Sequence, residues 1–216
     1  MKMNKTIDYY NTHANDFVQD TVTASMHLQQ DAFLSCLPAH AHVLDLGAGS
    51  GRDSLYFMQH GCLVTMVDGS DAMCKACEKL TGQRAIHSTF LEFETQEKYD
   101  GIWACASLLH LHKEEIPVVL SHLAGMLNKP NKLYLSFKYG NFEGQRNERY
   151  FTDLTEDGLA LLIRETNAMK FTIKYGGYTI NRQFITEDVR PGKSTRWLNT
   201  FEPNRRPATI ASVTLL

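Results

Sequence analysis

The sequence predicts an α/β fold with a doubly wound, mostly parallel sheet, helices on both of its faces and an antiparallel edge. The first observation is that short apolar runs alternate with helical stretches of about 10–15 residues, which is typical of repeated βαβ crossovers. The second is that no internal repeat, low-complexity stretch or Pro/Gly/Ser-rich linker divides the 216 residues. At roughly 150 residues per domain, this length favours one domain. We expect that domain to span 1–203, with a helical cap at 1–38 and the sheet core at 42–203.

The cap is predicted to contain two short helices. Apolar residues at three- and four-residue spacing indicate the first one, and a second apolar stripe lies between 26 and 37, before Pro38. The first stripe consists of Ile7, Tyr10, Ala14 and Phe17.

The core is expected to begin with five parallel strands separated by helices. Buried parallel strands are short, nearly continuous apolar runs. Such runs lie at 42–46, 62–67, 85–87, 99–105 and 132–138. The helices between them are expected at 53–60, 71–80 and 113–127.

After residue 138 the pattern changes to a polar loop, 139–151, and one more helix. Thr155 is the expected N-cap of that helix, which runs to about Asn167, because acidic residues follow it in the first turn. Three later segments look like strands joined by short turns, which favours antiparallel pairing at one edge: 170–175, 178–185 and 196–201. For the last stretch, 204–216, three interpretations stay open, an appended tail, an expression remnant or a packing strand.

A glycine-rich turn follows the first strand, with glycines at positions 47, 49 and 51. Missing side chains let a ligand approach the backbone and the free N–H groups of the next helix. The dinucleotide fingerprint is G-x-G-x-x-G, and the third glycine comes one residue early here, which argues against NAD. Asp45 stands directly before the turn, where its carboxylate suits a cationic amino group better than a pyrophosphate. By itself such a turn is a weak signal, since glycines also serve as simple turn punctuation.

A second acidic residue, Asp68, ends the second strand 23 residues after Asp45. A carboxylate at this place can accept hydrogen bonds from both ribose hydroxyls. Together the two acids predict a ligand that is a nucleoside bearing an ammonium group.

These residues resemble motif I and the acidic loop of class I S-adenosylmethionine-dependent methyltransferases, and the general resemblance spans roughly 7–201. The run Gly51–Phe57 is similar to that of the bacterial tellurite-resistance and thiol methyltransferase-like branch. The resemblance implies a Rossmann-like sheet of seven strands, S-adenosylmethionine as cofactor, S-adenosylhomocysteine as its product, and methyl transfer as the activity.

The resemblance also implies roles for single residues. Asp45 would contact the amine of the cofactor, Asp68 its ribose, and Tyr10 would close the first helix over the site, although core packing explains a tyrosine there equally well. Thr89 stands where the family usually has an acid facing the adenine amino group, so this contact departs from the pattern. The implied cofactor-binding residues are Tyr10, Asp45, Gly47, Ala48, Gly49, Asp68, Gly69, Met73, Thr89, Phe90 and Ala104.

On the acceptor side, His110 follows the fourth strand, where an imidazole could act as a base near pH 7. A histidine that caps or packs against the next helix is the alternative. Cations and aromatics gather after the fifth strand, and loops there lie over the ligand crevice of a doubly wound sheet. Because arginine forks suit oxyanions and carboxylates, we expect Arg146 and Arg149 to bind a small anionic or soft acceptor. The alternative is that these charges are simply solvated in loops. The cations and aromatics after the fifth strand are Lys138, Arg146, Arg149 and Tyr150, and a second group near the end is Arg190, Lys193, Arg196 and Trp197.

Composition excludes several other classes of function. A formal charge of -2 gives no overall attraction to DNA, RNA or anionic lipid. The fourth strand has neither the Asn/Asp-Pro-Pro-aromatic signature nor the Pro-Cys nucleophile of DNA methylases, so we expect no DNA partner. No apolar run reaches the roughly 20 residues of a membrane span, and no secretory signal is seen, so we expect a cytoplasmic protein without a membrane partner, as a monomer or homodimer.

Cysteine and histidine patterns do not predict a metal site. Five cysteines suit reduced thiols, and Cys74-x-x-Cys77 lacks a second ligand pair at zinc-like spacing. We expect no metal cofactor.

Two other functions stay open besides methyl transfer to a small molecule. One is a regulator that binds S-adenosylmethionine without catalysis, and the other is a methyltransferase of RNA or protein.

Overall fold

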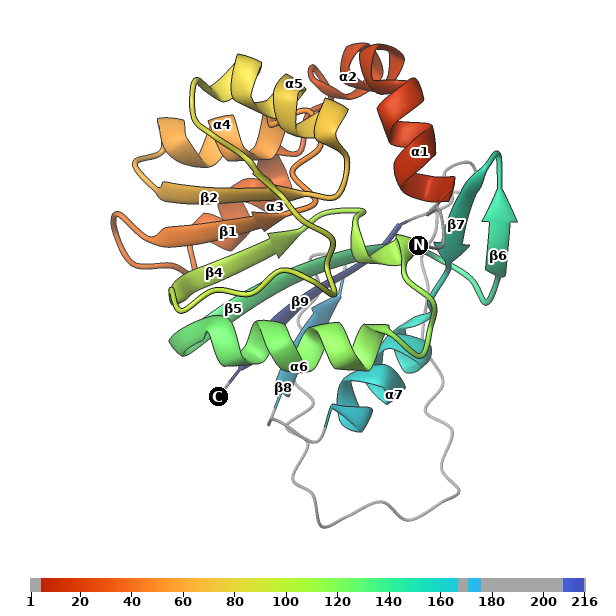
Figure 1. The fold of residues 1–216 in the computed structure, drawn as a ribbon. Helices are drawn as coiled ribbons and strands as arrows, with labels where there is room; N and C mark the ends of the chain where they lie inside the picture. The colour runs from red at the N-terminus through yellow and green to blue at the C-terminus, as the bar shows by residue number, and fades with distance from the viewer. Residues whose placement is uncertain (1–4, 167–170, 176–207, 216) are drawn as a thin grey trace, which may run out of the picture.

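The computed structural model describes residues 5–166, 171–175 and 208–215. Its centre is a seven-stranded sheet in the order β3-β2-β1-β4-β5-β9-β8 (Figure 1). The strands from β3 to β5 in this order are parallel to one another, whereas β9 is antiparallel to both β5 and β8. The doubly wound sheet with an antiparallel edge is thus confirmed. The strands are β1 His42–Leu46, β2 Leu63–Asp68, β3 Ile86–His87, β4 Tyr99–Ala104, β5 Leu127–Lys138, β8 Phe171–Tyr175 and β9 Ala208–Leu215.

Helices cover both faces of the sheet (Figure 1). On one face lie α3 His27–Leu34, α4 Arg52–Gln59 and α5 Asp71–Thr81, and on the other lie α6 Ile116–Met126 and α7 Glu156–Glu165. As expected, Thr155 caps α7, because its hydroxyl accepts the Gly158 N–H at 3.2 Å.

Each face has its own apolar core, because successive side chains of a strand point to opposite sides. On the α3–α5 side, Trp103 stacks on Tyr134 with ring centroids 3.7 Å apart and meets Phe33 and Phe57 edge-on. On the α6–α7 side, the core joins Ile102 and Leu135 of the sheet to aliphatic residues of both helices. Burial on both faces explains why the parallel strands read as continuous apolar runs.

Several helices and a hairpin gather at one end of the sheet, the end to which the parallel strands point with their carboxyl ends. There α1 Lys5–Thr12 contacts α2 Ala14–Thr21, α5 and a hairpin of β6 Glu143–Arg146 and β7 Arg149–Thr152, next to the 3₁₀ turn η1 Leu108–His110 (Figure 1). In doubly wound folds, ligands bind in the crevice at this end.

Two expectations are corrected by the structure, and a third that was left open is decided. The cap has three helices instead of two, because the first apolar stripe is broken at His13, whose ψ of 23° is not helical. The segment 139–151 is no simple loop but contains the hairpin, whose turn residues Asn147 and Glu148 both have positive φ, as a two-residue hairpin turn requires. Of the three interpretations left open for 204–216, the packing strand is the one observed, because Ala208–Leu215 forms β9 inside the sheet; its β-branched residues favour a strand.

Some expectations fall outside the described residues. These are the segments 178–185 and 196–201 and the second cationic group, Arg190, Lys193, Arg196 and Trp197. Within the described part, no helix is both long and apolar enough to cross a membrane.

Candidate functional site

The glycine-rich turn lies between β1 and α4 and is held against β2. The N–H groups of Gly47 and Ala48 both donate to the carbonyl of Val67, at 2.8 and 3.0 Å. Gly47 has φ +82°, and a Cβ added there would lie 2.4 Å from Cβ of Ser107. This position therefore requires glycine, both for its positive φ and because the loop after β4 approaches it closely.

Asp45 is a buried carboxyl beneath this turn. Its side chain accepts the hydroxyl hydrogen of Ser54 at 2.5 Å, and only 2% of the residue is exposed. Burial, followed by the nearby Asp53 carboxylate, raises the pKa of Asp45 to about 8. A carboxylate in such surroundings is stabilised when a cation comes to lie beside it. Sequence reasoning missed Ser54, although a small polar residue in the first turn of α4 was a usable signal.

Asp68 is fixed at the carboxyl end of β2 by two backbone donors. Its Oδ2 accepts the Gly49 N–H at 2.9 Å, and its Oδ1 accepts the Ser70 N–H at 2.8 Å. Burial raises the pKa of Asp68, while these two N–H groups act in the opposite direction. Each carboxylate oxygen keeps a further lone pair, so Asp68 can still accept two hydroxyl groups of a ligand.

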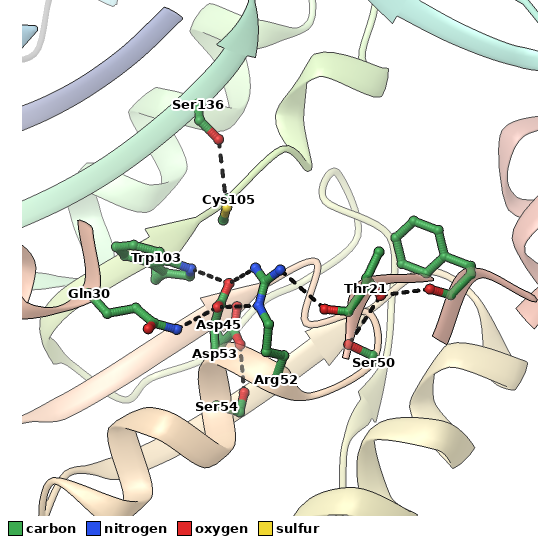
Figure 2. A network of polar contacts seen from close by, with 11 residues as sticks. Thr21, Gln30, Asp45, Ser50, Arg52, Asp53, Ser54, Trp103, Cys105 and Ser136 are labelled. Carbon is green, nitrogen blue, oxygen red and sulfur yellow. Dashed lines mark hydrogen bonds and ion pairs between the residues drawn. The ribbon is translucent and has the colours of Figure 1, made fainter. Parts of the chain in front are cut away.

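A polar network that sequence reasoning missed anchors the start of α4 (Figure 2). Arg52 donates to both oxygens of Asp53, through Nε at 2.8 Å and Nη2 at 2.9 Å. Asp53 also accepts Nε2 of Gln30 at 2.7 Å and Nε1 of Trp103 at 2.9 Å. The network ties α3 and β4 to the helix below Asp45. Arg52 and Asp53 both lie in the run 51–57, which was singled out from the sequence. The sequence does not indicate, however, which side chains they bind.

The cap helices lie directly on the turn and on the end of β2. A Cβ placed on Gly49 would lie 3.5 Å from the ring of Phe17, and one on Gly69 would lie 3.2 Å from Ile7. Asn11 accepts the Ser70 hydroxyl at 2.7 Å, which ties α1 to the start of α5. The cap therefore forms a lid over the glycine-rich turn and the end of β2.

The remaining residues expected to bind the cofactor are Met73, Thr89, Phe90 and Ala104. Met73 and Ala104 are buried, and Phe90 lies 3.5 Å from a Cβ placed on Gly47. Thr89 donates its hydroxyl to Glu92 at 2.8 Å, so a carboxylate does lie beside the position where the sequence lacks one. Ser107, which sequence reasoning did not single out, has a buried hydroxyl without a partner among the described residues.

Tyr10, His110 and Arg149 meet where α1, η1 and β7 come together. The hydroxyl of Tyr10 lies 2.9 Å from Nε2 of His110, and Nδ1 of His110 lies 2.6 Å from the Tyr150 carbonyl. Arg149 lies over the ring of Tyr9 at 4.5 Å and directs Nη1 to the Tyr10 oxygen at 3.4 Å. The structure thus brings together two of the three residues expected on the acceptor side.

The third, Arg146, points to a different partner. Its guanidinium forms a two-pronged ion pair with Asp153, at 2.9 and 2.6 Å, and stacks over the ring of Phe142 at 3.8 Å. Both prongs of its fork are therefore occupied within the hairpin region. For Arg149, by contrast, no ion pair exists with any described residue, and its Nε is buried without a hydrogen-bond partner there.

The described residues contain no group of three or more histidine, cysteine, aspartate or glutamate side chains placed to hold a metal ion. The cysteines are free thiols, and burial raises the pKa of Cys74 to about 12.

Comparison with known proteins gives one family match and a likeness of fold. Residues 43–130 match the family model described as a methyltransferase domain. No curated protein matches the chain. Three solved structures illustrate the likeness of fold, each at low identity.

The first is 1,6-didemethyltoxoflavin-N1-methyltransferase from Burkholderia thailandensis (TM-score 0.62, 19% identity, 100% of this chain and 92% of that chain covered). The second is magnesium protoporphyrin IX methyltransferase from Synechocystis PCC 6803 (TM-score 0.61, 20% identity, 100% of this chain and 99% of that chain covered). The third is a TehB-like S-adenosylmethionine-dependent methyltransferase from Corynebacterium glutamicum (TM-score 0.65, 12% identity, 95% of this chain and 99% of that chain covered).

The methyltransferase-domain model thus matches the glycine-rich turn and the strands around it, and the sheet has the fold of these solved methyltransferases. At these identities the solved structures share only their fold with this chain. Which acceptor it uses is therefore argued from its own residues.

Proposed function

We propose that this methyltransferase transfers the methyl group of S-adenosylmethionine to a small anionic or soft acceptor, such as a thiol, a chalcogen oxyanion or a carboxylate-bearing metabolite. The observation that carries the proposal is Arg149, a half-buried cation at the lid that lacks a carboxylate partner among the described residues. Burying a charge is costly unless it is paired, so a site of this kind favours an anionic ligand.

The cofactor side fits the same proposal. Asp45 is a buried carboxyl that gains from a cation, which the ammonium group of the cofactor supplies, and Asp68 is oriented to accept the ribose hydroxyls. Gly47, Ala48, Gly49 and Ala104 would lie along the methionine part. Gly69, Met73, Thr89 and Phe90 would lie beside the adenine, and Tyr10 would close over the site. The free hydroxyl of Ser107 adds one further polar contact beside Gly47.

Two features support the finer placement near the tellurite-resistance and thiol methyltransferase-like branch. The run Gly51–Phe57 resembles that branch, and one structural neighbour is described as TehB-like. Soft or oxyanionic acceptors are accordingly the first compounds to test.

The first experiment is a methyl-transfer screen with S-adenosylmethionine over thiols, selenite, tellurite, carboxylates, RNA and peptides. We expect turnover with a small anionic or thiol acceptor. Turnover only with RNA or a peptide would contradict the acceptor class. Calorimetric titration with S-adenosylhomocysteine and with NAD tests the cofactor, and binding of NAD alone would contradict its assignment.

The second experiment compares two arginines of the same hairpin, Arg149→Gln and Arg146→Gln. Losing a charge-assisted hydrogen bond costs about 1.5–3 kcal/mol, so we expect kcat/KM of Arg149→Gln to fall about 10- to 150-fold, with unchanged affinity for S-adenosylhomocysteine. Arg146→Gln is the matched control, which should lower thermal stability through loss of the Asp153 pair and affect turnover less. Equal losses in both variants, or lost cofactor affinity in Arg149→Gln, would remove Arg149 from the acceptor site.

A further inference from the structure

The hydrogen positions in the contact between Tyr10 and His110 follow from its geometry. Nδ1 of His110 lies 2.6 Å from the carbonyl oxygen of Tyr150. A carbonyl oxygen only accepts hydrogen bonds, so Nδ1 carries the hydrogen. In a neutral imidazole the other nitrogen is then an acceptor, and the Tyr10 hydroxyl, 2.9 Å from Nε2, must be the donor.

The surroundings keep this imidazole neutral. The groups that face His110 are Tyr10 from α1, Arg149 from β7 and Lys138 from the end of β5, and its ring also packs on Phe151. Burial, with the two cations acting in the same direction, lowers the pKa of His110 to about 4, although the hydrogen bond to Tyr150 opposes this shift. No carboxylate among the described residues has a resolved interaction with the ring that would favour the charged form.

Both nitrogens of His110 are therefore engaged, and the hydrogen of Tyr10 is committed to one of them. Burial raises the pKa of Tyr10, so its phenol stays protonated near neutral pH. Neither side chain is free to accept a proton from an acceptor bound at Arg149. Asp45 and Asp68 accept hydrogen bonds from Ser54, Gly49 and Ser70, and under the proposed function their remaining lone pairs belong to the cofactor.

We propose that His110 is a positioning residue, which holds the hydroxyl of Tyr10 and joins the lid to β7, and that the acceptor is methylated as an anion without an enzymatic general base. The inference rests on the proposed function and deepens it: the acceptor belongs to the compounds that are deprotonated before they bind. Its lone pair forms the bond to the methyl carbon while the carbon–sulfur bond breaks and the electron pair stays on sulfur, so no proton moves in the step. Arg149 supplies the positive charge that keeps the anion bound.

The hydrogen positions can be measured without turnover. Long-range ¹H–¹⁵N spectra of the full chain, with His110 assigned by its absence in His110→Gln, report which ring nitrogen carries the hydrogen. We expect a neutral ring with hydrogen on Nδ1 across about pH 5.5–8.5, where an ordinary histidine would titrate near 6.5. Hydrogen on Nε2, or a titration midpoint above about 6, would overturn the proposal.

Two matched substitutions separate positioning from base catalysis. In His110→Gln the side-chain oxygen can reach the place of Nε2 and accept the Tyr10 hydroxyl, whereas in His110→Asn the amide nitrogen can reach the place of Nδ1 and donate to Tyr150. We expect His110→Gln to retain kcat/KM within about tenfold and His110→Asn to lose more, whereas removing a general base costs about 10²–10⁴-fold. A loss of that size in His110→Gln, for any acceptor found in the screen, would overturn the proposal.

The pH profile gives the third readout. With an arenethiol and an alkanethiol as probes, the inflection of kcat/KM should follow the pKa of each thiol, in the wild type and in His110→Gln alike. An inflection common to both thiols that disappears in His110→Gln would show an enzymatic base and overturn the inference. A wild type that does not bind S-adenosylhomocysteine would instead contradict the proposed function, which leaves the spectroscopic result to decide on His110.

Discussion

Replacing Asp45 by Asn is expected to remove a pH dependence from cofactor binding. In the free protein the pKa of Asp45 is raised to about 8, chiefly by burial, so the carboxyl is mostly protonated at pH 7. A bound ammonium group favours the carboxylate, and binding therefore releases a proton from Asp45. Asparagine has a similar shape but no proton to release.

The magnitude follows from the raised pKa. One pKa unit corresponds to about 1.4 kcal/mol, so ionising Asp45 at pH 7 weakens binding roughly tenfold relative to a carboxylate that is already charged. The affinity for S-adenosylhomocysteine should rise about tenfold between pH 6 and pH 7 and level off above pH 8. At pH 7 about 0.9 proton should be released per ligand bound, from the ratio of about ten to one between the two forms.

Stability should change in the opposite sense. The folded-state pKa lies above the unfolded value of 3.8, so between about pH 4 and pH 8 the folded protein binds more protons than the unfolded one. The free energy of unfolding of the wild type therefore falls as the pH rises through this window, and Asp45→Asn should not show this fall. The variant thus loses cofactor affinity while its stability at pH 8 is equal or greater.

Calorimetry in buffers of different ionisation enthalpy counts the released protons, and urea unfolding at pH 5 and pH 8 gives the stabilities. Comparing the two proteins cancels the ligand's own titration. A wild-type affinity that does not vary with pH, or an Asp45→Asn variant that binds S-adenosylhomocysteine as tightly as the wild type, would refute this reasoning.

Two further predictions concern the framework of the site. Gly47→Ala should abolish measurable binding of S-adenosylhomocysteine and lower the thermal midpoint, because it adds a clash with Ser107 to the cost of a left-handed residue, about 1–2 kcal/mol. Gly82→Ala is its control, with φ +72° and no atom within 4 Å of the added Cβ; it should show the conformational cost alone, and an equal effect of both variants would contradict the clash. Trp103→Phe removes one hydrogen bond to the buried Asp53 carboxylate and should lower the free energy of unfolding, measured in urea, by about 1.5–3 kcal/mol. An unchanged value would show that the ion pair with Arg52 is enough to stabilise this carboxylate.

The parts of the fold that could be predicted from sequence are those buried on both faces. The parallel strands are continuous apolar runs, and their order along the chain with intervening helices restricts the topology to few choices. The hairpin of β6 and β7 was missed because it lacks such a pattern: its Glu143–Arg146 strand has no apolar alternation, and its turn contains no glycine. β9 was left open because pairing between distant segments leaves no local pattern.

The site divides in a similar way. Asp45, Asp68 and the glycines could be placed together from the sequence, because they lie at the ends of strands, and sequence order determines where those ends meet. Arg146 and Arg149 look alike in sequence, and only the hairpin register and Asp153 distinguish the ion-paired guanidinium from the one without an ion pair to a described residue. The partners of His110 come from positions 10 and 150, and no local pattern could reveal that both of its nitrogens are engaged.

The position of β9 has a consequence for how the chain is made. The ribosome synthesises β8 before β9, yet in the finished sheet β9 lies between β8 and β5. Until β9 has been synthesised, β5 keeps an unpaired edge and β8 has no place in the sheet. Unpaired edges invite association with other chains, and pairing between distant segments is slow. The nascent protein should therefore pass through a stage in which its other strands are complete but its sheet is open, and this stage is where chaperones would be needed most.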